Sequence, residues 1–169
     1  ALKPQEIALF SGGLDSLGGA IDLIQNGKGR ALLISHSSNP KTAGWQKELF
    51  NDLKKPLERQ NQPLHVPVWA HKIGERSHET TQRTRSFLYA SLAATAACIF
   101  KLDRFKMYEN GIISFNLPIS GQVIGARASR TTHPQVLKGY SELFSQLTGK
   151  QFVAENPFIW KTRAEVIDV

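Results

Sequence analysis

A run of serines and glycines followed by an acid carries the clearest chemical signal in the chain. It follows the apolar residues 7–10 and comprises Ser11, Gly12, Gly13, Leu14, Asp15 and Ser16. A Gly-Gly turn between a strand and a helix exposes consecutive backbone N–H groups, and it points the positive end of the helix dipole at a ligand. The serine hydroxyls add donors, and the carboxylate of Asp15 can hold a hard cation. The run therefore predicts a polyphosphate site with Asp15 as the candidate Mg²⁺ ligand.

This run differs from two familiar phosphate-binding patterns. No Gly-Lys-Ser/Thr follows it, as a Walker P-loop requires, and its glycines lack the spacing of the dinucleotide fingerprint. Two other interpretations stay open at this point. The run could be a glycine-rich turn without a ligand, and Asp15 could be a helix-start charge that only favours the dipole.

Two arginines, Arg83 and Arg85, precede an apolar helix pattern. Guanidinium groups bind phosphate or carboxylate in bidentate fashion, whereas a positive charge at a helix start is mildly unfavourable. This conflict favours a functional role over a solvated surface, and more so for Arg85. We expect Arg85 to stabilise charge that develops at a reacting phosphate.

Two more polar segments form the two ends of the long connection at 109–133. Glu109, Asn110 and Gly111 follow an expected strand, where a glycine permits close approach of a ligand and an asparagine amide can read a base edge. Simple turn chemistry is the alternative. The second segment comprises Arg130, Thr131, Thr132 and His133.

This second segment is expected to serve both as a helix start and as an anion clamp over the bound ligand. Thr132 is the expected N-cap, and Pro134 suits the first turn of the helix that follows. His133 is the one histidine that we propose for proton transfer.

Strand and helix patterns alternate along the chain. Strands separated by helices form βαβ crossovers in a parallel sheet, so the sequence predicts an α/β fold: a doubly wound, five-stranded, Rossmann-like sheet with helices on both faces. Ligands in such sheets bind beyond the carboxyl ends of the strands. The segments that follow residues 10, 36 and 108 should therefore line one crevice. The expected strands are 6–10, 30–36, 64–70, 104–108 and 152–154; the expected helices are 14–26, 44–61, 86–102, 134–148 and from 161 onward.

Single residues refine this expectation. Pro67 marks its strand as an edge strand, and Pro56 should kink or divide the second helix. The helix at 86–102 is apolar nearly all round, which predicts burial.

Composition bounds the class of protein. The 169 residues fit one domain, and the net charge of +7 favours anionic partners without choosing between nucleotides and nucleic acid. The single cysteine, Cys98, excludes a disulfide framework and suggests a reducing, cytoplasmic setting. The longest apolar stretch, 87–100, is too short to span a membrane. The chain starts at Ala1 and stops inside an expected helix, so we expect a piece of a longer protein.

Three histidines could suggest a metal site, but we do not expect them to form one. The spacing of His65, His71 and His78 is neither helical nor hairpin-like, which favours scattered surface residues.

The form strand, SGGLDS, helix resembles the PP-loop of the N-type ATP pyrophosphatases, whose fold is of the adenine nucleotide alpha hydrolase type. Further motifs resemble the 7-cyano-7-deazaguanine synthase family of the queuosine pathway, most closely its Qat branch in anti-phage defence operons. They are the segments RTRSF at 83–87, ENG at 109–111, SFNLP at 114–118, SRTTHP at 129–134 and NPF at 156–158. Family members continue into a cysteine-rich zinc site, which would lie outside this chain.

The resemblance implies that ATP and Mg²⁺ are bound and that a carboxylate is activated by adenylation. It assigns catalysis to Asp15, Arg85 and Arg130. ATP binding falls to residues 11–16, to Ser35 and His36 at the end of the second strand, and to Arg85 and Gly111. Substrate binding falls to Glu109, Asn110, Asn116, Arg130, Thr131, Thr132, His133 and Lys161.

The expected function is therefore adenylation of a 7-deazaguanine-type carboxylate with release of pyrophosphate, followed by attack of ammonia or a protein amine. Operon partner proteins are possible acceptors. A tRNA-modifying or amide-forming PP-loop enzyme is one alternative, which the net charge of +7 keeps open. A non-catalytic nucleotide-binding scaffold is the other.

Overall fold

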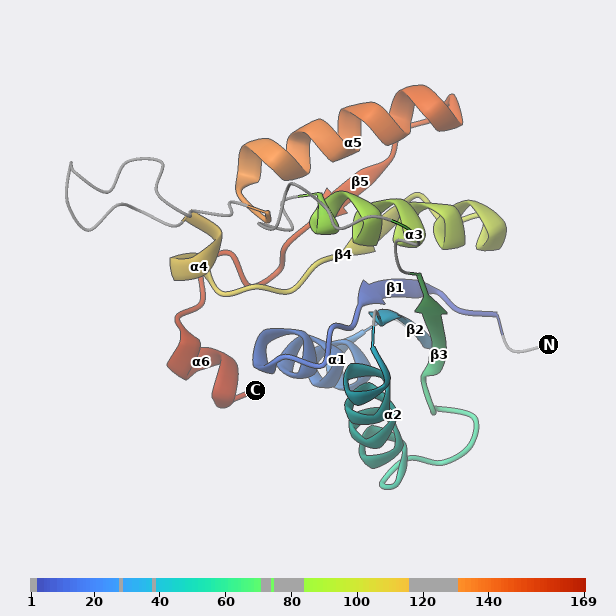
Figure 1. The fold of residues 1–169 in the computed structure, drawn as a ribbon, viewed down its shortest axis with the longest axis vertical. Helices are drawn as coiled ribbons and strands as arrows, with labels where there is room; N and C mark the ends of the chain where they lie inside the picture. Colours follow the sequence, from blue (N-terminus) through green and yellow to red (C-terminus); the bar gives the residue numbers. More distant parts are fainter. Residues whose placement is uncertain (1–2, 28, 38, 71–73, 75–83, 116–130) are drawn as a thin grey trace.

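The computed structural model describes residues 3–27, 29–37, 39–70, 74, 84–115 and 131–169. Its centre is a five-stranded, all-parallel sheet with the strand order β3-β2-β1-β4-β5, which confirms the predicted doubly wound α/β fold (Figure 1). The elements are β1 (Glu6–Leu9), α1 (Leu14–Asn26), β2 (Ala31–Ser37), α2 (Pro40–Lys54), β3 (Leu64–Trp69), α3 (Arg85–Phe100), β4 (Arg104–Lys106), α4 (Gly111–Phe115), α5 (Pro134–Thr148), β5 (Val153–Glu155) and α6 (Arg163–Ile167).

Helices cover both faces of the sheet. Successive residues of a strand point to opposite faces, so the continuous apolar runs of β1 and β2 supply two cores. Ile7 and Leu9 pack with α3 and α5, whereas Ala8 and Phe10 pack with α1, α2 and α6. In Figure 1, α3 and α5 lie on one side of the strands and α1 and α2 on the other.

The strand order reverses between β1 and β4. The chain moves outward from β1 through β2 to β3, then returns to place β4 on the other side of β1. The long helices that follow these strands, α1 after β1 and α5 after β4, cover opposite faces of the sheet, and a crevice opens at the carboxyl ends of the two strands.

The second helix differs from its predicted range of 44–61. It begins at Pro40, because the side chain of Asn39 accepts a hydrogen bond from the Thr42 N–H at 2.9 Å and proline suits the first helical position. It ends at Lys54, so Pro56 lies beyond the helix and does not kink it. Pro67 does lie in an edge strand, as predicted.

The predicted all-round burial of the third helix is wrong. Its small and aromatic residues Tyr89, Ala90, Ala93, Ala94 and Ala97 form one buried stripe against the sheet. On the opposite side, Phe87 and Ile99 are exposed. The reason is that the buried stripe is the side of α3 that packs on β1, β2 and β4, and residues that face away from these strands stay exposed.

Two glycines inside α1 allow close packing around the crevice. A Cβ at Gly19 would lie 2.0 Å from Cγ of Tyr108, and a Cβ at Gly18 would lie 3.0 Å from the side chain of Val166 in α6. The ring of Tyr108 stacks edge-on against Phe158 at 4.8 Å, so it has no room to withdraw. The segment after β4 therefore lies directly against the backbone of α1.

We expect Gly19→Ala to destabilise the protein by about 1–3 kcal/mol, because the new methyl group overlaps the Tyr108 ring. Gly139→Ala is the matched control: Gly139 also lies within a helix, and a methyl group added there would meet no atom within 4 Å. There the substitution should stabilise by about 0.5–1 kcal/mol through helix propensity. Urea denaturation of both variants measures the difference, and equal effects would contradict the packing argument.

Candidate functional site

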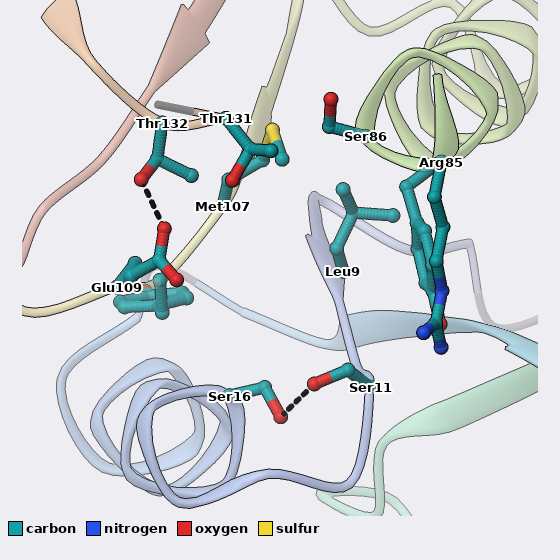
Figure 2. A pocket seen from close by; sticks show the side chains of 11 residues that line it. Leu9, Ser11, Ser16, Arg85, Ser86, Met107, Glu109, Thr131 and Thr132 are labelled. Carbon is teal, nitrogen blue, oxygen red and sulfur yellow. Dashed lines mark hydrogen bonds between the residues drawn. The ribbon is translucent and has the colours of Figure 1, made fainter. Parts of the chain in front are cut away.

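A cleft of about 490 Å³ opens at the reversal of strand order. Its walls come from the end of β1 and the loop after it, the first turn of α1, the start of α3, the segment after β4, and residues 131 and 132 (Figure 2). Small-molecule sites typically have about 300–1,000 Å³. The structure thus brings together two of the three segments predicted to line one crevice, those after residues 10 and 108, whereas no residue of the segment after residue 36 lines the cleft.

The SGGLDS loop contributes Ser11 and Ser16 to one wall, and the N–H groups of its two glycines are paired within the loop. Gly12 has a φ of 84°, a left-handed conformation that glycine adopts without strain. The N–H of Gly12 donates to Ser16 Oγ at 3.2 Å, and the N–H of Gly13 donates to Ser11 Oγ at 3.3 Å. The two hydroxyls lie 3.1 Å apart. Gly13 is the N-cap of α1 and makes no side-chain cap, so the first-turn N–H groups have no helical partner.

Asp15 lies in that first turn with its two carboxylate oxygens in different environments. Oδ2 accepts a hydrogen bond from Nδ2 of Asn110 at 3.0 Å. Oδ1 is buried and has no hydrogen-bond partner among the described residues. An unpaired, buried carboxylate oxygen is costly unless a ligand satisfies it, and a hard cation prefers such an oxygen. Asp15 therefore fits the predicted Mg²⁺ role.

Glu109 faces the loop from the opposite wall (Figure 2). Its carboxylate accepts a hydrogen bond from the hydroxyl of Thr132, whose Oγ1 also lies 2.9 Å from Oγ of Ser114. Burial raises the pKa of the Glu109 carboxyl, and the negative charge of Asp15 raises it further, against the hydrogen bonds from Thr132 and Thr131. Glu109, which lines the cleft, therefore interacts with a second carboxylate, that of Asp15, which lies in the first turn of α1 and is not itself among the lining residues.

The predicted helix cap at Thr132 is wrong. His133 is the N-cap of α5, and its ring Nδ1 accepts from the Gln135 N–H at 3.2 Å. Thr132 is instead buried in the hydrogen-bonded group around Glu109. Proton transfer by His133 stays a prediction, with Nδ1 already engaged in the cap.

Arg85 is the first residue of α3 and lines the cleft beside Tyr89. Its guanidinium lies 5.6 Å from the Tyr89 ring centre and donates to the Tyr89 hydroxyl at 3.4 Å. Figure 2 shows its side chain extending along the cleft toward the level of Ser11. Arg83, Asn116 and Arg130 lie outside the described residues.

The end of β2 is more heavily engaged than the sequence indicated. The Ser35 hydroxyl donates to the carbonyl of Phe10 at 2.7 Å, and the His36 carbonyl accepts from Gln46 at 3.2 Å and from Tyr89 at 3.0 Å. His36 Nε2 lies 2.8 Å from the Ala70 carbonyl, while its Nδ1 is buried without a described partner. Both residues are buried, and their side chains support the strand ends around the cleft.

Gly111 and Lys161 contact each other, and the space beside Gly111 is filled by the protein's own backbone. The Gly111 N–H donates to the Lys161 carbonyl at 2.8 Å, and a Cβ at Gly111 would lie 2.2 Å from the Ile159 carbonyl oxygen. The Lys161 ammonium lies 4.9 Å from the Phe158 ring centre. The glycine predicted to permit a ligand's approach thus permits the approach of this chain's own backbone.

Sequence reasoning missed two buried amides that hold the site together. Gln46 donates from Nε2 to the Ser11 carbonyl at 3.0 Å, and Asn156 donates to the Glu109 carbonyl at 2.7 Å. The signal for Gln46 was its spacing four residues before the buried Phe50, which places a polar side chain on the apolar face of α2. Asn156 was visible only as part of the NPF motif.

Other classes of site find no support in the described part of the chain. Nowhere in it do three or more histidine, cysteine, aspartate or glutamate side chains gather as a metal cluster. Within the same ranges, no helix has the length and apolar character needed to cross a membrane.

The fold and the site define a doubly wound, parallel α/β protein with a glycine-rich loop at its strand-order reversal. No known family model matches the sequence, and no curated protein matches it significantly.

The burial of His65 makes the stability of the protein pH-dependent. The one Ser35 hydrogen is donated to Phe10, so His65 Nε2–H donates to Ser35 Oγ at 2.8 Å. Burial lowers the pKa of His65 below its usual 6.5, and the charge of Lys54 lowers it further. The neutral form is therefore favoured on folding; its contribution is complete above pH 6.5 and is lost as the pH falls toward the folded-state pKa.

We expect the free energy of unfolding to decrease as the pH falls below 6.5, and to decrease less in His65→Gln, which cannot gain a proton. Urea denaturation at several pH values measures both proteins. The same pH dependence in the two would contradict the role of His65.

Proposed function

We propose that this chain binds ATP with Mg²⁺ in the cleft and adenylates the carboxylate of a 7-deazaguanine-type substrate, releasing pyrophosphate before ammonia or a protein amine attacks. The single observation that carries the proposal is the SGGLDS loop at the strand-order reversal, with Asp15 in the first turn of α1 and its buried Oδ1 unpaired among the described residues. The likeness to PP-loop enzymes adds the reaction class.

The loop supplies the features that a pyrophosphate group needs. The first-turn N–H groups, which have no carbonyl partner within the helix, and the positive end of α1 favour an anion. The hydroxyls of Ser11 and Ser16 now satisfy the glycine N–H groups, and phosphate oxygens can take their place as acceptors. A Mg²⁺ ion accompanying ATP would neutralise phosphate charge, with Asp15 as its protein ligand.

Bond changes in the proposed reaction are simple. A substrate carboxylate oxygen forms a bond to the α-phosphorus, and the bond from that phosphorus to the β-phosphate oxygen breaks, so pyrophosphate leaves with the electron pair. The chain's own contribution is positioning and charge stabilisation. Arg85, on the wall at the start of α3, is the described cation best placed to stabilise negative charge at the reacting phosphate.

Glu109 and Thr132 are proposed to contact the acceptor substrate. They line the cleft across from the loop, and their hydrogen bond to each other leaves carboxylate lone pairs for donors of a purine-like base. Asn110 faces Asp15 and its amide is engaged at both ends. We therefore do not assign it to base recognition.

The net charge of +7 keeps a second candidate function, a tRNA-modifying or amide-forming enzyme of the same fold. RNA binding that weakens steeply with salt would favour it. A nucleotide-binding scaffold without chemistry is a weaker candidate, because Arg85 lines the cleft where a cation could stabilise charge that develops at a reacting phosphate.

Pyrophosphate release by the full-length protein with ATP, Mg²⁺ and 7-carboxy-7-deazaguanine tests the proposal. We expect Asp15→Asn to lower the rate by at least about 100-fold, because it removes the cation ligand while keeping the side chain's shape. Asp52→Asn, an exposed aspartate of α2, is the control and should be unaffected. Equal rates in wild type and Asp15→Asn would refute the site, and ATP binding without pyrophosphate release would favour the scaffold.

A further inference from the structure

Asn110 uses both ends of its side-chain amide within the protein. Nδ2 donates to Asp15 Oδ2 at 3.0 Å, and Oδ1 accepts from the Ile113 N–H at 3.1 Å, which caps the first turn of α4. The orientation is unambiguous, because the opposite one would face an amide N–H to the Ile113 N–H and an oxygen to a carboxylate. The side chain is 1% exposed.

The backbone around Asn110 is held equally firmly. The N–H of the next residue, Gly111, donates to the Lys161 carbonyl, and no side chain larger than hydrogen fits there beside Ile159. The preceding residue, Glu109, is held through its N–H and its carbonyl by Asn156, at 3.2 and 2.7 Å. Asn110 is therefore a rigid donor that reaches Asp15 across 95 residues of sequence.

The Asn110 hydrogen bond determines which oxygen of the Asp15 carboxylate is paired. A carboxylate in the first turn of a helix can rotate to satisfy both oxygens with first-turn N–H groups or water. The Asn110 bond occupies Oδ2, and Oδ1 is buried with no hydrogen-bond partner in the described part of the chain.

We propose that Asn110 is a positioning residue that holds Asp15 with one oxygen available to the cation accompanying the nucleotide. This inference rests on the proposed function. It assigns Asn110 a role through Asp15 and none in contact with the substrate base.

Asn110→Ser separates this role from the cap. Serine caps a helix as well as asparagine does, but it is too short to reach Asp15. Calorimetry on the full-length protein with α,β-methylene-ATP, in Mg²⁺ or in EDTA, is the readout. We expect the affinity in Mg²⁺ to fall about tenfold, equivalent to about 1.4 kcal/mol, and the affinity in EDTA to change less than about twofold. Asn39→Ser, the same change at the N-cap of α2, is the matched control and should alter neither affinity.

A double-mutant cycle with Asp15→Asn completes the test. If Asn110 acts through Asp15, then Asn110→Ser has no further effect on Mg²⁺-dependent affinity in the Asp15→Asn background. Equal losses in Mg²⁺ and EDTA, or independent effects of the two substitutions, would overturn the positioning role and leave the proposed function standing. Wild-type protein that binds the nucleotide equally in Mg²⁺ and EDTA, or not at all, would overturn both.

Discussion

The contact between the Tyr108 ring and the backbone of α1 at Gly19 sets the dimensions of the whole site. A parallel sheet alone places the carboxyl ends of β1 and β4 side by side, but it does not determine how near the following segments lie to each other. The missing side chain at Gly19 lets Tyr108 lie against the helix, and the residues after Tyr108 then follow the start of α1 closely. Asn110 can reach Asp15 only because of this approach.

Negative charge beside the cleft would repel a free anion, but it suits an anion that binds together with a cation. Burial raises the pKa of Glu109, and the nearby negative charge of Asp15 raises it further, so the two carboxylates interact unfavourably beside the cleft. A free polyphosphate would meet this negative charge, and the partial charge of a helix N-terminus offsets only part of it. A divalent cation that travels with the nucleotide removes the conflict, which is why the two acids and the phosphate loop are compatible in one site.

The alternation of strand patterns with helix patterns along the sequence is sufficient to predict the parallel sheet. The glycine-rich loop after the first strand can also be recognised from the sequence, because its six residues are contiguous. The sequence also contains the signal for the start of α2, since Asn39 is an N-cap and Pro40 a first-turn proline. The predicted range of 44–61 follows the apolar residues instead and therefore starts four residues late. The roles of Asn110, Thr132 and Gly111 depend on contacts with residues far along the chain. The same residue types occur in a simple turn and where another part of the backbone approaches closely. The sequence alone therefore cannot distinguish these two roles, and the three-dimensional structure is needed.

Gln46 has a consequence for the thermodynamics of ligand capture. Its one amide donates to the Ser11 and His36 carbonyls and accepts from the Ser37 hydroxyl, so the ends of β1 and β2 are joined through α2. The loop and the neighbouring strand end therefore cannot fluctuate independently. The conformational entropy of these two segments is already lost when the protein folds. A ligand that contacts both segments therefore orders them little further, and the entropic cost of binding is small.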